Sequence, residues 1–276
     1  MIKAGIIGGA GYTAGELIRI LLNHQYVEID FIYSTSNAGN SVSKIHQDLL
    51  GSTDLKFSGE VNTAVDVVFL CLGHGNSKAF LEEYIFPEST IVIDLSNDFR
   101  LKPDAEFQGR EFIYGLTELN KSAIKEADSI ANPGCFATAI QLALLPLADA
   151  GLIKDDVHVN AVTGATGAGT SLSATTHFTW RDNNFSYYKP FTHQHMGEIN
   201  QSVKSLQGNF DKEIHFLPNR GDFSRGIFAT AYTYFDGDLE EVTSVYKKFY
   251  KDAVENMNLV FGLPQTEGLQ LKASYF

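Results

Sequence analysis

The spacing of apolar positions alternates between two periods along the first half of the chain. Short apolar runs predict buried strands, and between them stand stretches in which apolar residues recur with helical spacing. Strands that alternate with helices predict a parallel, doubly wound sheet of the Rossmann type, which binds ligands at the carboxyl ends of its strands. The predicted strands are Ile2–Ile7, Val27–Tyr33, Val65–Leu72 and Thr90–Leu95, and the predicted helices are Glu16–Leu22 and Ser77–Ile85.

A glycine-rich turn separates the first predicted strand from the first helix. In this turn Gly8 makes the bend and Gly11 lets a phosphate approach the backbone, while Tyr12 and Thr13 begin the helix. A strand, a glycine turn and a helix N-terminus form the unit that places a pyrophosphate on backbone N–H groups. Ala14 is the third small position and still permits close packing of helix on strand. The alternative is a plain turn between strand and helix.

Polar side chains at two further strand ends complete the predicted dinucleotide site. The second strand ends in Ser34-Thr35-Ser36-Asn37, without the carboxylate that would hold an NAD ribose. Asp30 has nearly the expected spacing but lies in mid-strand. Hydroxyl groups at Ser34 and Ser36 tolerate a 2′-phosphate, which favours NADP over NAD. His74, between two glycines, lies just past another strand end.

The stretch Asn132-Pro133-Gly134-Cys135 precedes an apolar run with helical spacing, residues 137–145. Cys135 is therefore predicted at a helix N-terminus, where unpaired N–H groups and the helix dipole favour a thiolate. We interpret Cys135 as a nucleophile, and the alternative is a buried structural cysteine. Cys71 continues the apolar run Val67–Leu70 and is predicted to be a packing residue.

Two histidines and an acid lie together in the second half, at the predicted start of a helix near Met196. A nucleophilic cysteine needs a base from elsewhere in the chain. His193 and His195 can supply the base, and Glu198 can orient it. The alternatives are an exposed polar loop or a pair of metal ligands. We expect no metal site, because no third Cys or His stands at a suitable spacing.

A second glycine cluster follows the predicted strand Val157–Thr163. With Gly164 and Gly167, it suggests that both ends of an extended cofactor are contacted, and the alternative is a flexible linker. Further along, Arg220 and Arg225 flank a short turn before the predicted strand Gly226–Tyr232. Arginines at these positions can clamp a phosphate or carboxylate, although each taken singly is more typical of a surface ion pair.

Composition narrows the class of protein. A chain of 276 residues, 44% hydrophobic, can bury a sizeable core and is predicted to form two domains. Its net charge of -12 argues against nucleic acid or an anionic membrane as partner. Two cysteines rule out a disulfide framework and fit a reducing compartment. Without a signal-peptide pattern or an apolar run of membrane-spanning length, the expected location is the cytoplasm.

Taken together and in this order, these motifs resemble N-acetyl-gamma-glutamyl-phosphate reductase, a relative of aspartate-semialdehyde dehydrogenase. The resemblance runs from about Gly5 to Thr230 and resumes at Asn256. It rests on Gly8-Gly9-Ala10-Gly11-Tyr12-Thr13, Asp94-Leu95-Ser96-Asn97-Asp98-Phe99-Arg100, Tyr114-Gly115-Leu116-Thr117-Glu118-Leu119, Asn132-Pro133-Gly134-Cys135, the loop from Gly164, His193-Gln194-His195 with Glu198-Ile199, and Arg225-Gly226-Ile227.

The resemblance implies NADPH-dependent reductive dephosphorylation of an N-acyl-gamma-glutamyl phosphate, in arginine biosynthesis. Cys135 would form a thioester, which hydride then reduces to the semialdehyde. His195 is the preferred acid/base, with His193 as its supporting or oxyanion partner. Arg100 and Arg225, with Glu198, are expected to hold the substrate. The acyl group, acetyl or succinyl, stays open. The alternatives are aspartate-semialdehyde dehydrogenase and a non-catalytic NADP sensor.

The same resemblance implies the domain organisation. An NADP-binding Rossmann domain would comprise residues 1–134 with 254–276, and residues 135–253 would form an α+β catalytic, substrate and dimerisation domain with a mixed sheet. A homodimer or homotetramer is expected. Relative to the family, Ala14 replaces a usual glycine, and Thr35 and Thr170 stand where basic residues are usual.

A larger departure lies near the C-terminus. The family carries a strand-rich segment and a Lys-Gly helix start where Glu255 runs directly into Asn256 here. Either the chain has lost part of its sheet, or the sequence joins two segments across residues that it omits. Losing strands would expose sheet edges, which favours the second explanation.

Overall fold

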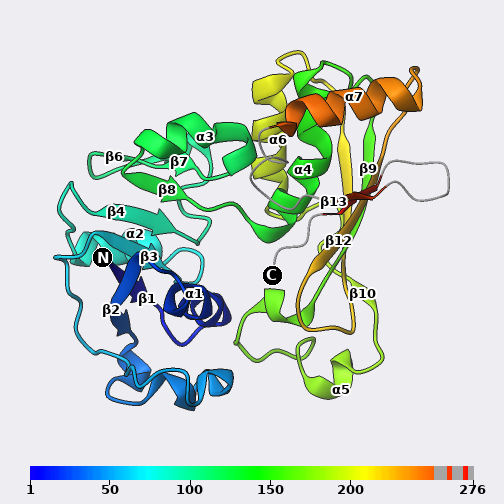
Figure 1. Cartoon of the computed structure of the whole chain (residues 1–276). Coiled ribbons are helices and arrows are strands. Elements are labelled where there is room, and N and C mark those ends of the chain that lie inside the picture. The colour runs from blue at the N-terminus through cyan, green and yellow to red at the C-terminus, as the bar shows by residue number, and fades with distance from the viewer. Residues whose placement is uncertain (252–259, 263–269, 273–276) are drawn as a thin grey trace. The chain divides into compact units, whose positions relative to one another are not determined.

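The computed structural model describes residues 1–251, 260–262 and 270–272. The chain divides into two compact units (Figure 1). The first comprises Met1–Gly134 with Gly169–Ser171, and the second comprises Cys135–Ala168 and the described residues from Leu172 onward.

The first unit is built on a six-stranded sheet in the order β2-β1-β3-β4-β8-β7, in which every pair of neighbours is parallel. This confirms the predicted doubly wound class. The strands are β1 (Ile2–Ile7), β2 (Val27–Tyr33), β3 (Val67–Leu70), β4 (Ile91–Asp94), β7 (Ile113–Tyr114) and β8 (Ser129–Ala131), with a separate hairpin of β5 (Glu106–Phe107) and β6 (Arg110–Glu111).

The helices of this unit are α1 (Tyr12–Leu22), α2 (Ser77–Glu83) and α3 (Thr117–Glu126), with short 3₁₀ turns η1 (Thr35–Asn37), η2 (Val42–Lys44), η3 (Gln47–Leu49) and η4 (Lys102–Asp104). The prediction for β1 and β2 is confirmed at both ends. Strands β3 and β4 are shorter than predicted. Val65 and Leu72 extend the apolar run because they pack into the core, and not because they join the ladder.

Helix α1 begins earlier than its apolar pattern indicates, at Tyr12. Its apolar positions then recur with helical spacing, and Ala14, Ile18 and Leu21 pack into the core beside Ile6 of β1. This packing sets the helix directly against the sheet. The first N–H groups of α1, which have no intrahelical partner, consequently open at the carboxyl end of the strands.

The second unit is built on a mixed sheet in the order β10-β11-β9-β12, as expected for an α+β domain. Strands β9 and β11 run parallel, and β10 and β12 pair antiparallel at the two sides. The strands are β9 (Val157–Thr163), β10 (Ser186–Tyr187), β11 (Ile214–Arg220) and β12 (Ile227–Tyr232), and the helices are α4 (Cys135–Asp149), η5 (Ala165–Ala168), α5 (Phe178–Arg181), α6 (Met196–Leu206) and α7 (Leu239–Phe249).

Side chains on one face of the mixed sheet form the core of the second unit. Alternate residues of β9, including Val157, Val159 and Ala161, pack with Phe216 of β11 against α4 and α6. Because side chains alternate along a strand, their neighbours point to the opposite face. On that face Tyr232 stacks on His158, with ring centroids 5.2 Å apart.

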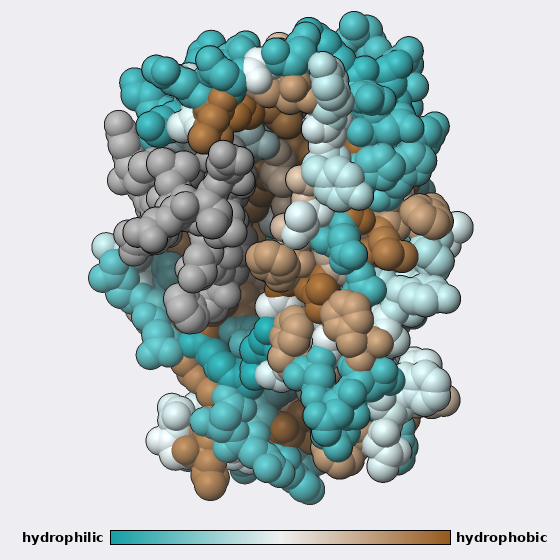
Figure 2. Space-filling view, turned by 90° about the vertical axis from the view of Figure 1, so that its right-hand side faces the viewer, coloured by the Kyte–Doolittle hydropathy of each residue, from teal (hydrophilic) through white to brown (hydrophobic). Residues whose placement is uncertain are grey.

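The opposite face of this sheet exposes apolar and aromatic side chains. Phe228 and Tyr232 of β12 are 69% and 63% exposed, and Tyr187 of β10 is 68% exposed. Figure 2 shows apolar side chains gathered among polar ones on the side of the molecule that it views. Within the part of the chain that the structure describes, no helix is long and apolar enough to cross a membrane.

Near the C-terminus the structure describes β13 (Val260–Gly262) and β14 (Gln270–Lys272), which pair antiparallel. The prediction that residues 254–276 return to the dinucleotide domain otherwise falls outside the described residues. The assignment of residues 135–253 to a separate catalytic domain stays a prediction.

Candidate active site

Cys135 is the first residue of α4 and its side chain is exposed. The prediction that it lies at a helix N-terminus is therefore confirmed. Pro133 and Gly134 before it are buried, as is Phe136 after it. The turn is thus anchored on both sides of an accessible thiol. A negative charge at this position is stabilised by the helix dipole and by the unpaired N–H groups of the first turn.

Phe136 connects the cysteine turn to both predicted histidines. Its ring is 1% exposed and lies 5.4 Å from the ring of His193 and 6.4 Å from that of His195, between centroids. The two histidine rings are themselves 4.6 Å apart, edge to face. Residues nearly sixty positions apart in the sequence are therefore brought together around one buried ring. The two histidines predicted as partners of Cys135 therefore pack against the residue that follows it in α4.

His193 is held as a neutral imidazole. Burial, followed by the positive charge of Lys189, lowers the pKa of His193 to about 4. The backbone N–H of His195 donates to Nδ1 of His193 over 3.3 Å, so the ring proton resides on Nε2. A neutral ring with a fixed Nε2–H can donate a hydrogen bond. It is poorly suited to releasing a full proton near pH 7, because that requires an imidazolium.

His195 and Glu198 lie at the start of α6, as the sequence predicts. His195 is the residue immediately before the helix, and Glu198 stands in its first turn. Both are buried, with 5% and 3% of their surfaces exposed. Ile199 and Val203 on the same helix pack into the core. The position of His195 is consequently fixed by a packed helix and not by a mobile loop.

Tyr188 joins this group, and sequence reasoning missed it. Its ring lies 5.7 Å from the ring of His193 and 6.5 Å from that of Phe136, between centroids. Burial, then the negative charge of Cys135, raise the pKa of Tyr188 to about 12, while Arg220 acts in the opposite direction. Tyr188 therefore stays protonated near the thiol. The aromatic pair Tyr187-Tyr188 was a visible signal, but the sequence does not tell which ring points inward.

The segment that carries Tyr188 has an unusual backbone. Asn183, Lys189 and Phe191 have positive φ angles of 50°, 44° and 61°, and these are three of the four such non-glycine residues in the described chain. Each costs free energy, of order 1 kcal/mol or more, that surrounding contacts must offset. Here the N–H of Phe191 donates to the carbonyl of Phe216 over 2.9 Å. Such strain concentrates at functional sites.

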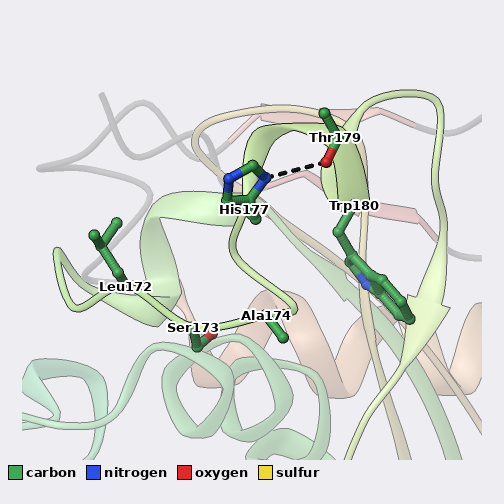
Figure 3. A pocket seen from close by; sticks show the side chains of 6 residues that line it. All are labelled: Leu172, Ser173, Ala174, His177, Thr179 and Trp180. Atoms are coloured by element: carbon green, nitrogen blue, oxygen red, sulfur yellow. Dashed lines mark hydrogen bonds between the residues drawn. The ribbon is translucent and has the colours of Figure 1, made fainter.

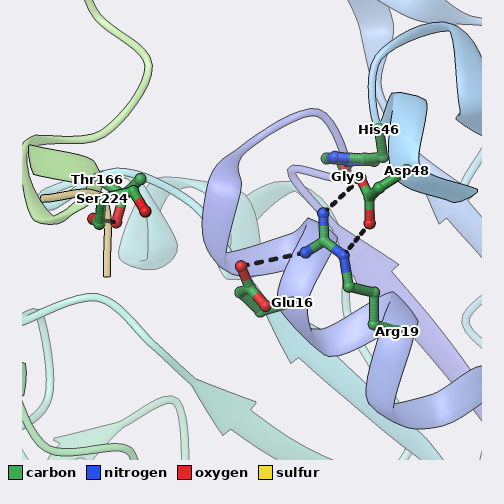
Figure 4. A network of polar contacts seen from close by, with 7 residues as sticks. All are labelled: Gly9, Glu16, Arg19, His46, Asp48, Thr166 and Ser224. Atoms are coloured by element: carbon green, nitrogen blue, oxygen red, sulfur yellow. Dashed lines mark hydrogen bonds and ion pairs between the residues drawn. The ribbon is translucent and has the colours of Figure 1, made fainter. Parts of the chain in front are cut away.

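The second glycine loop is an ordered turn, and the linker alternative is wrong. A Cβ at Gly164 would lie 2.4 Å from the carbonyl oxygen of Ser224, so only glycine fits there. Thr166 donates from both its N–H (3.1 Å) and its hydroxyl (2.6 Å) to that same carbonyl oxygen (Figure 4). These bonds fasten the loop, with Gly167 exposed, to the turn that bears Arg225, whose side chain is also exposed.

In the first unit the glycine loop forms a cradle at the end of β1. Gly8 has a φ of +78°, and a Cβ there would lie 2.6 Å from the carbonyl oxygen of Cys71. Beyond it, Gly11 precedes α1, and Tyr12 and Thr13 open the helix with exposed side chains. Bare backbone before a helix N-terminus fits the pyrophosphate of a dinucleotide. The loop from Gly8 to Gly11 and the start of α1 are therefore suited to bind a phosphate group, as predicted.

Polar contacts fix this loop from the side (Figure 4). His46 hydrogen-bonds through Nε2 to the carbonyl of Gly9 over 2.8 Å. Arg19 forms an ion pair with Asp48 and another with Glu16, and the Arg19 hydrogen bond lowers the pKa of Asp48 to about 2.

Ala14 permits the close packing of the first helix on the sheet, as the sequence predicts. It is fully buried and packs in one core cluster with Ile6 of β1. The next residue, Gly15, is also closely packed, since a Cβ there would lie 2.6 Å from Nδ1 of His46.

Further predicted cofactor residues follow other strands of the same sheet. Ser34 is buried and Ser36 exposed, and Asn37 donates to both hydroxyls. His74 is exposed and its Nδ1 accepts from the backbone N–H of Asn97 over 3.1 Å. Parallel strands end at one edge, so these groups share the edge that carries the glycine cradle. Asp30 lies within β2, as expected.

Arg100 is buried in the first unit, 4% exposed. Its Nε donates to the carbonyl of Asn132 over 2.8 Å and one Nη donates to the carbonyl of Leu95 over 2.9 Å. These two bonds tie the segment after β4 to the residue that precedes the cysteine turn. The arrangement adds a structural task to the substrate-binding role predicted for Arg100.

Cys71 provides the contrast. It follows β3, packs against the core, and has its pKa raised to about 12 by burial and then by the charge of Asp94. Its predicted packing role is confirmed.

A separate pocket of the second unit is lined by Leu172, Ser173, Ala174, His177, Thr179 and Trp180 (Figure 3) and contains none of the predicted site residues. Among the described residues, no group of three or more His, Cys, Asp or Glu is placed to hold a metal ion.

Comparison with known proteins identifies the family. Residues 3–127 match the semialdehyde dehydrogenase NAD binding domain, and residues 135–270 match the semialdehyde dehydrogenase dimerisation domain. An N-acetyl-gamma-glutamyl-phosphate reductase of Christiangramia forsetii is 55% identical, and one of Flavobacterium johnsoniae is 52% identical, each over all of both chains. The chain belongs to the N-acetyl-gamma-glutamyl-phosphate reductase family. The alignment with the first relative runs over 325 positions, against the 276 residues of this chain.

Solved structures show the same fold at low identity. Aspartate semialdehyde dehydrogenase II of Vibrio cholerae, complexed with ASA, superposes with a TM-score of 0.62 at 15% identity, covering 89% of this chain and 78% of that one. The enzyme of Candida albicans with NADP gives 0.60 at 15% identity, covering 89% and 75%. These likenesses support the two-part architecture of a parallel sheet and a mixed-sheet domain. The reductase relatives, at far higher identity, define the family.

Proposed function

We propose that this chain catalyses the NADPH-dependent reductive dephosphorylation of an N-acyl-gamma-glutamyl phosphate to the N-acyl-glutamate 5-semialdehyde, as a step of arginine biosynthesis. The observation that carries the proposal is Cys135, exposed at the start of α4 and joined through the Phe136 ring to His193 and His195. Membership of the reductase family supports the choice of substrate.

The chemistry assigned to the chain starts at Cys135. Its thiolate attacks the acyl carbon, the bond from that carbon to the phosphate oxygen breaks, and phosphate leaves with its electron pair. A thioester on Cys135 results. NADPH, when bound, supplies the hydride that reduces this thioester. His195 gives a proton to the oxygen that becomes negative and takes it back as the carbon–sulfur bond breaks, which regenerates the thiolate and releases the aldehyde.

Supporting roles follow from the contacts around the thiol. The neutral His193, with its proton on Nε2, donates a hydrogen bond to the developing oxyanion. Glu198 orients the catalytic histidine and the substrate, while Arg225 and Arg100 hold anionic substrate groups.

The proposed cofactor is NADP(H), held by backbone N–H groups at the start of α1. Gly8, Gly11, Tyr12 and Thr13 form the pyrophosphate cradle. Ser34 and Ser36 are proposed to lie beside the adenine-side ribose. The stretch Ser34-Thr35-Ser36-Asn37 contains no carboxylate that would repel a 2′-phosphate on that ribose. His74 and the second loop, through Gly164 and Gly167, complete the site.

Assembly and location belong to the same proposal. We propose a homodimer or homotetramer that works in the cytoplasm. Self-association is supported by the dimerisation domain that the second unit matches and by exposed aromatic residues, such as Phe228 and Tyr232, on the open face of the mixed sheet.

The reaction is tested most simply in reverse. N-acetylglutamate 5-semialdehyde, phosphate and NADP⁺ should produce NADPH at a rate that requires all three, and NAD⁺ should be a poorer oxidant. Aspartate semialdehyde, the substrate of the structural relatives, serves as the comparison. Faster turnover of aspartate semialdehyde would overturn the substrate assignment. Cofactor binding without turnover of this aldehyde or of either the N-acetyl or the N-succinyl form of glutamate 5-semialdehyde would indicate a sensor.

A further inference from the structure

Two arginines, Arg181 and Arg220, lie together at the end of β11. Arg181 ends the short helix α5 and is 7% exposed, and Arg220 ends β11. One Nη of Arg181 donates to the carbonyl of Arg220 over 3.4 Å, and the other donates to the hydroxyl of Ser186 over 2.8 Å. Ser186 and Arg220 are paired residues of β10 and β11, so Arg181 is bonded to both members of one residue pair in the sheet.

The positive charge of this pair is not balanced by an acidic neighbour. Among the described residues, no carboxylate forms an ion pair within 4.0 Å of either guanidinium. Burial, and then the charge of Arg220, lower the pKa of Arg181, and Asp222 only partly opposes them. An oxygen of Asp222 already accepts from the N–H of Asn183 over 2.9 Å. Two like charges in a buried place are unfavourable unless something compensates them.

Each of the two guanidinium groups also has one hydrogen-bond donor without an acceptor. The Nε atoms of Arg181 and Arg220 are buried and have no hydrogen-bond partner in the described chain. A buried N–H without an acceptor costs free energy, and native structures leave few such groups unpaired. The defect is the same at both residues: a negative oxygen is lacking. Because Arg220 is only half-buried, an anion can reach the pair from solvent.

The location relates the pair to the proposed chemistry. Side chains of β11 alternate, so Arg220 points to the same face of the sheet as Phe216, which packs 5.1 Å from the Phe136 ring. The guanidinium of Arg220 lies 4.8 Å from the centre of the Tyr188 ring, and burial, followed by the negative charge of Cys135, raises the pKa of Tyr188. Tyr188 therefore lies between Arg220 and the surroundings of Cys135.

We propose that Arg181 and Arg220 form an anion subsite that binds an oxyanion group of the substrate, a phosphate or a carboxylate, beside Cys135. This inference rests on the proposed function and deepens it. A guanidinium presents its donors as a planar fork, which matches two oxygens of one anion. Two sources offer this chemistry: the phosphate that leaves the acyl group, and a carboxylate remote from the reacting carbon, such as the free end of a succinyl group.

The test compares variants and probes by isothermal titration. Arg181→Gln and Arg220→Gln each remove one charge, and Lys204→Gln removes a charge from an exposed position on α6 as the matched control. The probes are inorganic phosphate, N-acetylglutamate and N-succinylglutamate, each with the unmodified full chain. We expect each arginine variant to weaken at least one probe about tenfold or more, while the control changes affinity less than about twofold.

The pattern across probes identifies the source of the anion. Loss confined to phosphate assigns the subsite to the leaving group. Loss confined to N-succinylglutamate assigns it to the carboxylate of the acyl chain, and loss for both glutamates assigns it to a carboxylate of the glutamyl part. If no probe loses affinity beyond the effect of Lys204→Gln, the anion subsite is refuted.

Thermal unfolding separates an anion site from a merely structural pair. With no anion present, Arg220→Gln relieves repulsion on Arg181 and should leave the Tm unchanged or raised. Phosphate or the bound glutamate should raise the Tm of the unmodified protein and not that of the variant. A large fall in Tm with the anion-induced rise intact would contradict the proposal. Failure of the proposed function is distinct: it would abolish semialdehyde turnover in the unmodified protein and leave these binding results unaffected.

Discussion

The two cysteines of this chain show how surroundings decide the use of one side chain. Cys71 directly follows β3, and Cys135 comes a few residues after β8. Cys71 faces the core, where burial and Asp94 raise its pKa to about 12. Cys135 is exposed at the first position of α4. The reactivity that we propose for Cys135 therefore rests on its placement at a helix N-terminus, and not on the presence of a thiol after a strand.

The largest expected effect is on turnover. Cys135→Ser should lower semialdehyde oxidation by about a thousandfold or more, because a serine hydroxyl is not ionised near neutral pH, and should leave NADP binding intact. Cys71→Ala should keep turnover within about twofold and lower the free energy of unfolding by about 1 kcal/mol. Steady-state rates and urea unfolding measure both. Equal losses of turnover in the two variants would remove the distinction.

Alkylation by iodoacetamide compares the thiols directly. At pH 7.5 Cys135 should be labelled hundreds of times faster than Cys71, since a pKa of about 12 leaves almost no thiolate and the Cys71 side chain is packed. Peptide mapping by mass spectrometry at timed intervals gives both rates. Denaturation in urea is the control and should bring the two rates together. Comparable labelling in the folded protein would contradict the contrast.

The two histidines near Cys135 should differ in a similar way. His195→Asn should lower kcat by about a hundredfold, as expected for loss of a general acid. His193→Asn should have a smaller effect, about tenfold, because a ring that is neutral at pH 7 supplies a hydrogen bond and not a proton. Removing His195 should also abolish one limb of the pH profile of kcat. A larger loss in the His193 variant would reverse the assignment.

Burial of neutral His193 makes stability depend on pH. With a pKa of about 4 in the folded state against about 6.5 when unfolded, the unfolded chain binds more protons between these values. The contribution, about 3 kcal/mol at most, is present above pH 6.5 and is lost as the pH falls towards 4. Urea unfolding from pH 4.5 to 7.5 should show this slope, and His193→Asn should flatten it. An unchanged slope in the variant would exclude His193 as its cause.

Much of this arrangement could be predicted from the sequence, for physical reasons. The bounds of β1 and β2 match the prediction, because each strand is rich in apolar residues and is followed directly by a turn, at Gly8 after β1 and at Ser34 after β2. The helix after Cys135 was predicted because its apolar residues recur with helical spacing. Local patterns of this kind need no knowledge of distant contacts.

The residues that sequence reasoning missed depend on contacts between distant segments. Tyr188 and Arg181 stand in a stretch of mixed aromatic and polar residues whose local pattern does not tell which side chains point inward. The pairing of β10 with β11 brings this stretch to Arg220. Likewise Gly164 requires its small size because of the carbonyl of Ser224, sixty positions away. Nothing in the local pattern encodes such approaches.

The central claim, that Cys135 forms an acyl-enzyme, is tested most directly by trapping that species. The protein is mixed with N-acetyl-gamma-glutamyl phosphate without NADPH, quenched in acid, and mapped by mass spectrometry, with Cys135→Ser as the control. The account predicts an acyl adduct on the peptide that contains Cys135, lost when NADPH is added before the quench. An adduct on Cys71, or steady turnover with no adduct on Cys135, would contradict it.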